Sequence, residues 1–320
     1  MSADEPPARP PGRPKGTQPP PEEAREARFG GSHAGARPLL QEGGCESASA
    51  AGLGEASPSP RAALRARLAA DGLDWLVPDW DAPGRVVAVS TTKRGGAAGE
   101  LDLGPSRVAD AANPAAVAAD RARLASFLPS PPVWLHQVHG IRVVEVDATN
   151  RAALLAAPPD ADAAFTRTPG VAVAVRAADC LPVLLSDRRG TVVAAAHAGW
   201  RGLAAGVLEA TVRAMAVDPS DVVAWIGPAI GPRAFEVGRD VLDAFVSSDP
   251  ADAACFVALR DGKWLADLRT LARRRLARAG AATVAGGAWC THEDAARFHS
   301  WRRDRSAGRM ATAIAIASAA

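Results

Sequence analysis

The sequence predicts a mixed α/β fold, a layered sandwich of two mixed β-sheets between helices that forms a single domain. From residue 75 onward, short β-branched runs bounded by Gly, Pro or Asp alternate with helical stretches. No period of 20 to 50 residues repeats, which excludes solenoids and propellers. The chain has 320 residues, enough to bury a core without disulfides.

The chain divides by composition into a tail, a connecting segment and a folded domain. Residues 1–60 hold 20 prolines and glycines and few apolar side chains, so we expect a disordered tail. Residues 61–73 are expected to be a linker or a short helix, because RAALRARLAA contains mostly helix formers. Burial of that helix is doubtful from the sequence. The folded domain is expected to span residues 74–320.

Strands and helices are expected in order along this domain. Strands are indicated by four apolar runs, which are VVAVSTT (86–92), VWLHQVHGIRVVEVD (133–147), VAVAVRAADCLPVLL (171–185) and TVVAAAHAGW (191–200). Helices are indicated where apolar residues recur at three and four, which is the case in Pro114–Phe127, Leu203–Met215, Arg239–Val246 and Leu265–Ala279.

Charge and hydropathy exclude several classes of partner. Lys and Arg number 37 against 35 Asp and Glu, so a net charge of +2 provides no field for a nucleic acid. No run approaches the roughly 18 apolar residues that span a bilayer. The first residues contain acids and prolines where a secretory signal has a basic start and an apolar run, so we expect a cytoplasmic protein. Its oligomeric state is not predicted.

Cysteine and histidine supply the candidate metal ligands. No C-x-x-C pair occurs among the cysteines, which are Cys45, Cys180, Cys255 and Cys290, so zinc fingers are excluded and the thiols are free or bind metal. His136 and His139 are three apart in a strand-like run and would face opposite sides. His139, followed by Gly140, fits the end of a strand.

Cys180 and His197 close the next two runs. A turn centred between Arg188 and Arg189 would pair Cys180 with His197 across a hairpin, with Cβ atoms roughly 4.5–5.5 Å apart. One thiolate and two imidazoles with a fourth position open favour catalytic Zn²⁺ over copper. Two alternatives stay open: all three residues are ordinary core residues, or Cys180 is a nucleophile with His197 as its base.

Arginines form a second group of candidate functional residues. FHSWRRDRSAGRMA, near the C-terminus, contains Arg302, Arg303, Arg305 and Arg309, and Arg201 follows the His197 segment. Lys93 begins a basic, Gly-rich loop. Forked guanidinium groups bind phosphate bidentately, although a solvated run of charge explains each loop equally well. Neither a Walker A nor a dinucleotide motif is present.

Six motifs carry a family resemblance. They are, in order, TTKRGG, VWLHQVHG, ADCLPVLL, AAAHAGWRG, IGPAIGPRAFEVG and FHSWRRDRSAGRMA. Together they closely resemble the laccase-domain purine nucleoside phosphorylases, a family formerly labelled multicopper polyphenol oxidases. The likeness extends from about Trp75 to Ile316.

The resemblance implies an activity and roles for particular residues. It implies one zinc ion and phosphorolysis of adenosine, inosine, guanosine and methylthioadenosine, with adenosine deamination beside it. The zinc ligands would be His139, Cys180 and His197, and Arg303 would be the catalytic, anion-binding arginine. Substrate or phosphate would also contact the basic residues Lys93, Arg201 and Arg309.

Some positions depart from the family pattern. Lys93 stands where arginine is usual, and His299 and Trp301 stand at tyrosine positions in a chain without tyrosine. The older oxidase assignment would need about ten histidines in H-x-H pairs, whereas the chain has six and no such pair. A zinc-stabilised binding module without turnover is a further alternative, but it would not need Arg303 or an open coordination position.

Overall fold

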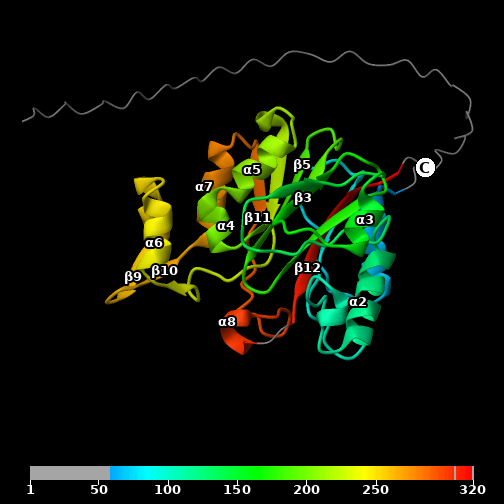
Figure 1. Ribbon diagram of the computed structural model, residues 1–320, viewed down its shortest axis with the longest axis horizontal. Coiled ribbons are helices and arrows are strands. Elements are labelled where there is room, and N and C mark those ends of the chain that lie inside the picture. The colour runs from blue at the N-terminus through cyan, green and yellow to red at the C-terminus, as the bar shows by residue number, and fades with distance from the viewer. Residues whose placement is uncertain (1–57, 306–307, 319–320) are drawn as a thin grey trace, which may run out of the picture. The chain divides into compact units, whose positions relative to one another are not determined.

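The computed structural model describes residues 58–305 and 308–318 (Figure 1). Apart from residues 58–60, the predicted disordered tail lies outside the described residues. Among the described helices, none combines the length and hydropathy needed to cross a bilayer.

Two β-sheets pack face to face at the centre of the fold. The larger sheet is mixed and has the order β11-β7-β5-β6-β3-β2. Its strands are β2 (Val143–Glu145), β3 (Ala163–Thr166), β5 (Leu181–Asp187), β6 (Val193–Ala198), β7 (Val222–Ile226) and β11 (Thr283–Gly286). The second sheet is antiparallel, in the order β1-β12-β4, with β1 (Val86–Ser90), β4 (Ala172–Ala177) and β12 (Met310–Ile316).

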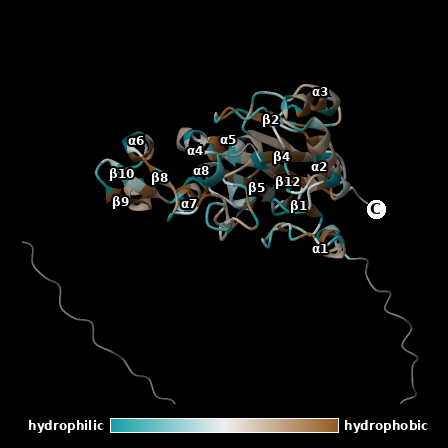
Figure 2. Cartoon of the chain, turned by 90° about the horizontal axis from the view of Figure 1, so that it is seen from below, coloured by the Kyte–Doolittle hydropathy of each residue, from teal (hydrophilic) through white to brown (hydrophobic). Residues whose placement is uncertain are grey.

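Helices cover the outer faces of both sheets. On the three-stranded sheet these are α1 (Pro60–Ala70) and α2 (Pro114–Ser126), and on the larger sheet they are α4 (Trp200–Ala205), α5 (Val207–Ala214) and α7 (Leu268–Arg278). The described chain also contains α3 (Arg151–Ala156), α6 (Arg239–Val246) and α8 (Trp301–Asp304). A small antiparallel sheet, β8-β10-β9, lies with α6 to one side of the body (Figures 1 and 2). Its strands are β8 (Glu236–Val237), β9 (Phe256–Arg260) and β10 (Lys263–Ala266).

Three apolar clusters confirm the predicted α/β layering. Val173 and Leu184 belong to the cluster between the two sheets. Leu124 of α2 packs on the outer face of the three-stranded sheet, and Leu203 and Leu276 pack on the outer face of the mixed sheet. The sandwich of two sheets between helices is therefore present, although only the larger sheet is mixed.

Helix α1 is an integral part of this core, and the doubt about its burial was misplaced. Ser59 accepts a hydrogen bond from the backbone N–H of Ala62, and Pro60 occupies the first turn. Leu64 and Leu68 are only 2% exposed, since a spacing of four places both on one helix face. The helix thereby closes the outer face of the three-stranded sheet.

The predicted register of the β5–β6 hairpin was wrong by two residues. His197 pairs with Pro182, and Cys180 lies in the turn just before β5. The carboxylate of Asp187 accepts hydrogen bonds from the backbone N–H groups of Thr191 and Val192, at 2.6 and 3.0 Å. These bonds lengthen the turn between β5 and β6. As a result, His197 pairs with a residue two positions after Cys180, the partner that was expected.

The structure corrects two further expectations about secondary structure, and each correction involves a residue with positive φ. His139 does not end a strand: residues 133–142 form only isolated bridges, and His139 has a φ of +62°. The single helix expected over Leu203–Met215 is divided into α4 and α5 by Gly206, whose φ is +98°. Only glycine adopts that conformation without strain.

The last expected helix begins later than predicted, at Leu268 instead of Leu265. The Asp267 side chain caps α7 by accepting hydrogen bonds from the backbone of Arg269 and Thr270. Leu265 belongs to β10 instead.

Candidate metal centre

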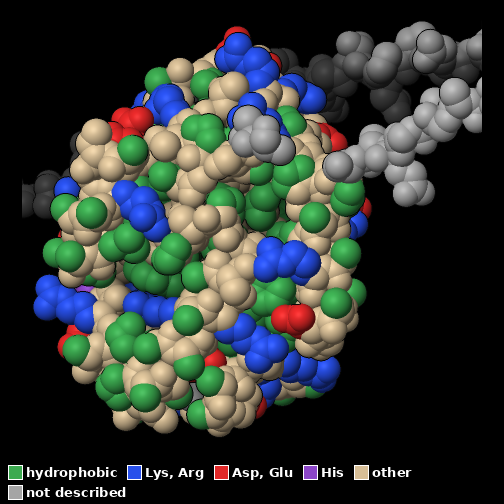
Figure 3. All heavy atoms as spheres, turned by 90° about the vertical axis from the view of Figure 1, so that its right-hand side faces the viewer, with side chains coloured by type: hydrophobic (Ala, Val, Ile, Leu, Met, Phe, Trp, Pro, Cys, Tyr) green, Lys and Arg blue, Asp and Glu red, His purple; other side chains and the backbone are tan. Residues whose placement is uncertain are grey.

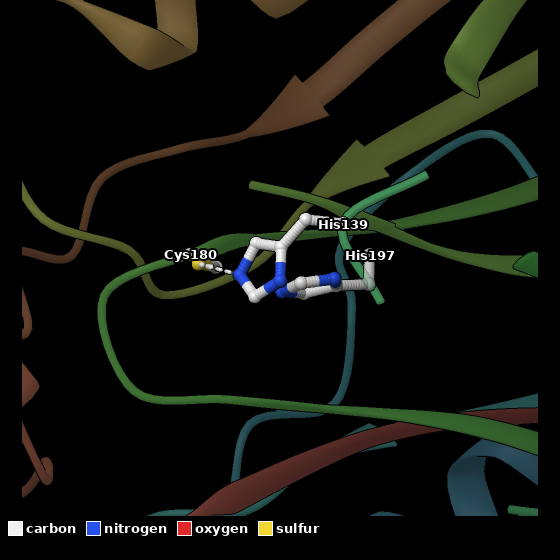
Figure 4. A group of neighbouring side chains, drawn as sticks. All are labelled: His139, Cys180 and His197. Carbon is white, nitrogen blue, oxygen red and sulfur yellow. Dashed lines mark hydrogen bonds between the residues drawn. The ribbon is translucent and has the colours of Figure 1, made fainter. Parts of the chain in front are cut away.

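His139, Cys180 and His197 converge on one point (Figure 4). Their ligand atoms all lie within 4.8 Å of one another, and Sγ of Cys180 is 3.8 Å from Nε2 of His139. The three residues come from the 138–140 turn, the β4–β5 turn and strand β6. His139 is exposed, which argues against the alternative that it is an ordinary core histidine.

A buried carboxylate positions two of these ligands. Asp162, which is fully buried, accepts hydrogen bonds from the backbone N–H groups of Val138, His139 and Gly140 at 3.2, 3.0 and 2.6 Å. Its Oδ1 also lies 2.8 Å from Nδ1 of His197. That bond leaves Nε2 of His197 to face the centre, as in carboxylate–histidine–metal arrangements.

Sequence reasoning missed Asp162. The available signal was an acid placed directly before the buried strand β3, where an unpartnered carboxylate would be costly.

A glycine lets the ligand-bearing segments approach closely. A Cβ atom at Gly199 would lie 2.8 Å from Cδ2 of His139 and 3.2 Å from Sγ of Cys180. The first distance is shorter than normal packing allows. The glycine in the AHAGWRG motif therefore serves the geometry of the centre.

The protonation states of Cys180 and His197 support each other. Burial raises the pKa of the Cys180 thiol, but His197 and hydrogen bonding from both histidines outweigh burial and lower the pKa to about 6. Burial lowers the pKa of His197, whereas Cys180 and Asp162 outweigh it and raise the pKa to about 9. Cys180 is therefore a thiolate at neutral pH, which is the form that binds metals.

The donor set fits a single metal ion. Within the described part of the chain, the group contains these three ligands, one sulfur and two nitrogens. Three protein ligands leave a coordination position for water or substrate, the arrangement of catalytic metal sites.

The ligands line a cavity of about 480 Å³ with a strongly cationic wall. Four arginines contribute to this wall, and they are Arg176, Arg201, Arg302 and Arg309. Asp179 is the one acidic residue among the lining residues, and Ile230, Phe235 and Leu268 form an apolar part. The volume is that of a typical small-molecule site.

Asp179 links the Cys180 turn to the C-terminal arginine segment. Its carboxylate accepts hydrogen bonds from the hydroxyls of Thr291 and Ser300, at 2.6 and 3.0 Å, and from the backbone N–H of Arg302 at 2.6 Å. Asp179 also has a φ of +86°, uncommon for a residue other than glycine. The turn that presents Cys180 is thus fixed to the segment that contributes Arg302.

The structure brings only some of the predicted basic residues to the cavity. Arg201 and Arg309 line it, whereas Lys93 pairs with Glu100 and is not among the lining residues.

Arg303 also lies outside the cavity lining, and the protein itself engages its guanidinium. Nη1 donates to the carbonyl oxygens of Thr291 and His292, at 2.8 and 2.9 Å, and Nη2 donates to that of Phe298. Nε and Nη2 donate to the carboxylate of Asp304. These contacts use all five N–H donors, so Arg303 supports the loop rather than facing the cavity.

Basic residues elsewhere do not form a continuous stripe on the face shown in Figure 3. Lys and Arg side chains are scattered there among hydrophobic and uncharged surface. The arrangement on this face agrees with the near-neutral net charge of the chain.

The fold is a two-sheet α/β sandwich, and its cationic cavity contains a thiolate and two imidazoles that fit a metal ion. Residues 87–317 match the family described as multi-copper polyphenol oxidoreductase laccase, and the chain belongs to that family. The resemblance seen in the six sequence motifs is thereby confirmed.

This chain matches several named proteins over nearly their whole length. A Pseudomonas aeruginosa protein named purine nucleoside phosphorylase is 49% identical over 245 residues, which is 75% of this chain and 97% of the relative. The Escherichia coli protein named purine nucleoside phosphorylase YfiH is 48% identical over 245 residues, with the same coverage.

Solved structures share the fold. A crystal structure of a Neisseria meningitidis protein matches with a TM-score of 0.71 and 46% identity, covering 77% of this chain and 100% of the other. YlmD from Geobacillus stearothermophilus matches with a TM-score of 0.68 and 31% identity, covering 77% and 99%.

Proposed function

We propose that this chain is a zinc-dependent purine nucleoside phosphorylase. Its substrates are adenosine, inosine and guanosine, which it converts with phosphate into base and ribose-1-phosphate, and methylthioadenosine, which gives adenine and methylthioribose-1-phosphate. Adenosine deamination is its second activity. One observation carries the proposal: the metal-ligand group and four arginines line the same cavity. The names of the P. aeruginosa and E. coli relatives support the reaction class.

Zinc is the ion that we assign to His139, Cys180 and His197. One thiolate with two imidazoles suits zinc, whereas a blue-copper and trinuclear centre needs many more histidines than this group provides. When bound, zinc supplies a Lewis acid and makes water a better nucleophile near neutral pH, as deamination requires. Asp162 would hold His197 in the tautomer that coordinates.

The arginines would position phosphate beneath the ribose carbon that is attacked. Phosphorolysis passes through an oxocarbenium-like state, so an anion held close to that carbon stabilises it. Arg201 and Arg309 were predicted for this role and line the cavity, and Arg302 joins them there. The guanidinium of Arg201 stacks on the Trp200 ring at 4.3 Å, which restricts its motion.

The purine would occupy the apolar part of the cavity. Ile230, Phe235 and Leu268 line this part, and they offer a surface for the flat face of a base. Because the base and the phosphate need surfaces of opposite character, this division of the cavity suits a nucleoside together with an anion.

Turnover assays on metal-analysed protein test the proposal. We expect inosine to be consumed only when phosphate is present, and adenosine to yield inosine without phosphate. Cys180→Ala should lose zinc and both activities, whereas Cys255→Ala, which changes a buried cysteine outside the metal group, should keep them. Full zinc occupancy in Cys180→Ala would remove this residue from the site.

A further inference from the structure

Arg176 carries a charge that the surrounding protein does not neutralise directly. It lies on β4, is only 8% exposed and lines the metal-site cavity. Among the described residues its guanidinium takes part in no ion pair, and both of its hydrogen bonds go to backbone carbonyl oxygens. Sequence reasoning missed it because it stands inside an apolar strand run.

Neutral backbone groups hold the Arg176 side chain in place. Nη1 donates to the carbonyl oxygen of Gly104 and Nη2 to that of Leu135. Its Nε is buried and has no hydrogen-bond partner in the described structure. These two bonds therefore use two of the five N–H donors of the guanidinium.

The backbone of Arg176 is fixed as well. Its N–H donates to Oε1 of Gln137 at 2.9 Å, and Nε2 of Gln137 donates to its carbonyl oxygen at 2.8 Å. Gln137 also lines the cavity. The guanidinium is thus presented from a rigid position on the cavity wall.

Other positive groups surround Arg176. Burial, followed by the charges of Arg121 and Arg309, lowers its pKa to about 9, and Asp102 opposes that shift. The Asp102 carboxylate accepts hydrogen bonds from the backbone N–H groups of Gly104 and Arg309. The charge of Asp102 therefore acts on both Arg121 and Arg176.

A buried charge in this situation calls for a counter-ion. Removing an ion from water costs several kcal/mol, and an opposite charge must offset that cost. Because no ion pair among the described residues includes Arg176, a ligand in the adjoining cavity can supply this opposite charge. A guanidinium with unused N–H donors suits an oxyanion.

We propose that Arg176, together with Arg309, forms an anion subsite that holds a phosphate group in the cavity. The choice of inorganic phosphate as occupant rests on the proposed phosphorolysis. The 5′-phosphate of a nucleotide has the same chemistry, and the experiment below separates the two sources.

Thermal unfolding of the zinc-loaded protein tests the subsite without relying on turnover. Wild-type protein and Arg176→Met are compared without ligand, with inorganic phosphate, with adenosine 5′-monophosphate and with adenosine. At a phosphate concentration that raises the wild-type Tm, we expect a much smaller rise in the Tm of Arg176→Met. Phosphate affinity should fall about tenfold or more, the effect of losing a charged hydrogen bond.

The ligand-free proteins provide a second readout. Arg176→Met should be at least as stable as wild type, because it removes an uncompensated buried charge. Arg275→Met is the matched control, since Arg275 is 6% exposed but lies 3.4 Å from Glu209 and 3.9 Å from Asp252. The control should have a lower Tm in every buffer and keep the full phosphate-induced shift.

The outcomes separate the subsite from the proposed function. A phosphate-induced shift that depends on Arg176, in a protein without phosphorolysis, supports the subsite and contradicts the activity. A shift with the nucleotide alone supports the subsite with the nucleotide as occupant. Equal phosphate shifts in wild type and Arg176→Met, or no shift in wild type with either phosphate compound, overturn the subsite.

A conservative variant covers a folding failure of Arg176→Met. Arg176→Lys keeps the charge but loses the forked donor geometry, so its phosphate affinity should fall severalfold while zinc content is unchanged. Unaltered phosphate affinity in Arg176→Lys would likewise contradict the subsite.

Discussion

Replacing Asp162 with Asn tests whether the metal ligands depend on the buried carboxylate behind them. Oδ2 of Asp162 accepts from the backbone of Val138 and Gly140, and Oδ1 accepts from His139 and from the His197 ring. An amide presents one acceptor and one NH₂ donor. Whichever way the introduced amide is turned, its NH₂ group faces two donors.

The magnitude follows from the two lost bonds. A hydrogen bond to a charged group contributes about 1.5–3 kcal/mol, so the variant should lose on the order of 3–6 kcal/mol of its unfolding free energy. Loss of such a partner typically weakens metal binding by about 10- to 100-fold. Both effects should appear at pH 7, because the pKa of Asp162 is below its ordinary value and the carboxylate is ionised.

Chelator competition and denaturant titration measure the two effects. Asp187→Asn is the control: Asp187 is also fully buried and holds backbone N–H groups, but at the far end of the β5–β6 hairpin. We expect both variants to lose stability and only Asp162→Asn to lose zinc affinity. Zinc affinities of the two variants within twofold of each other would refute the reasoning.

Three more predictions follow from the structure. Zinc uptake by metal-free protein at pH 7.5 should release about one proton, from His197, because Cys180 is already a thiolate at this pH; a pH indicator dye that shows two protons would contradict this. Leu68→Ala should cost about 2–5 kcal/mol in a denaturant titration without changing zinc content, and a cost below about 0.5 kcal/mol would mean that α1 is not part of the core. Arg303→Met should lower Tm while the phosphate KM stays constant, and the opposite pattern would restore a phosphate role to Arg303.

The sequence predicted those features whose chemistry is local. The three metal ligands stand in short motifs with distinctive residue types, and the apolar runs predicted the layers of the fold. Leu64 and Leu68 were less apparent, because the helix that contains them is rich in arginine and alanine.

Features that depend on particular side-chain hydrogen bonds, within a turn or between distant segments, were not predictable in this way. The hairpin register depends on side-chain bonds of Asp187 within its own turn, which no hydropathy pattern encodes. Asp179 meets Thr291 and Ser300 across more than a hundred residues of sequence, and Arg176 meets Gly104 across 72. In the sequence, Arg303 resembled a phosphate ligand. In the structure its guanidinium donates hydrogen bonds to carbonyl oxygens that only the folded loop brings next to it.

Ribose-1-phosphate formation from inosine by the purified, zinc-loaded protein is the most direct test of the central claim. We expect this product to form only with phosphate present and to disappear in Cys180→Ala, while Cys255→Ala forms it at the wild-type rate. A folded, zinc-replete protein that forms no ribose-1-phosphate from inosine, adenosine or guanosine, and no methylthioribose-1-phosphate from methylthioadenosine, would contradict the claim.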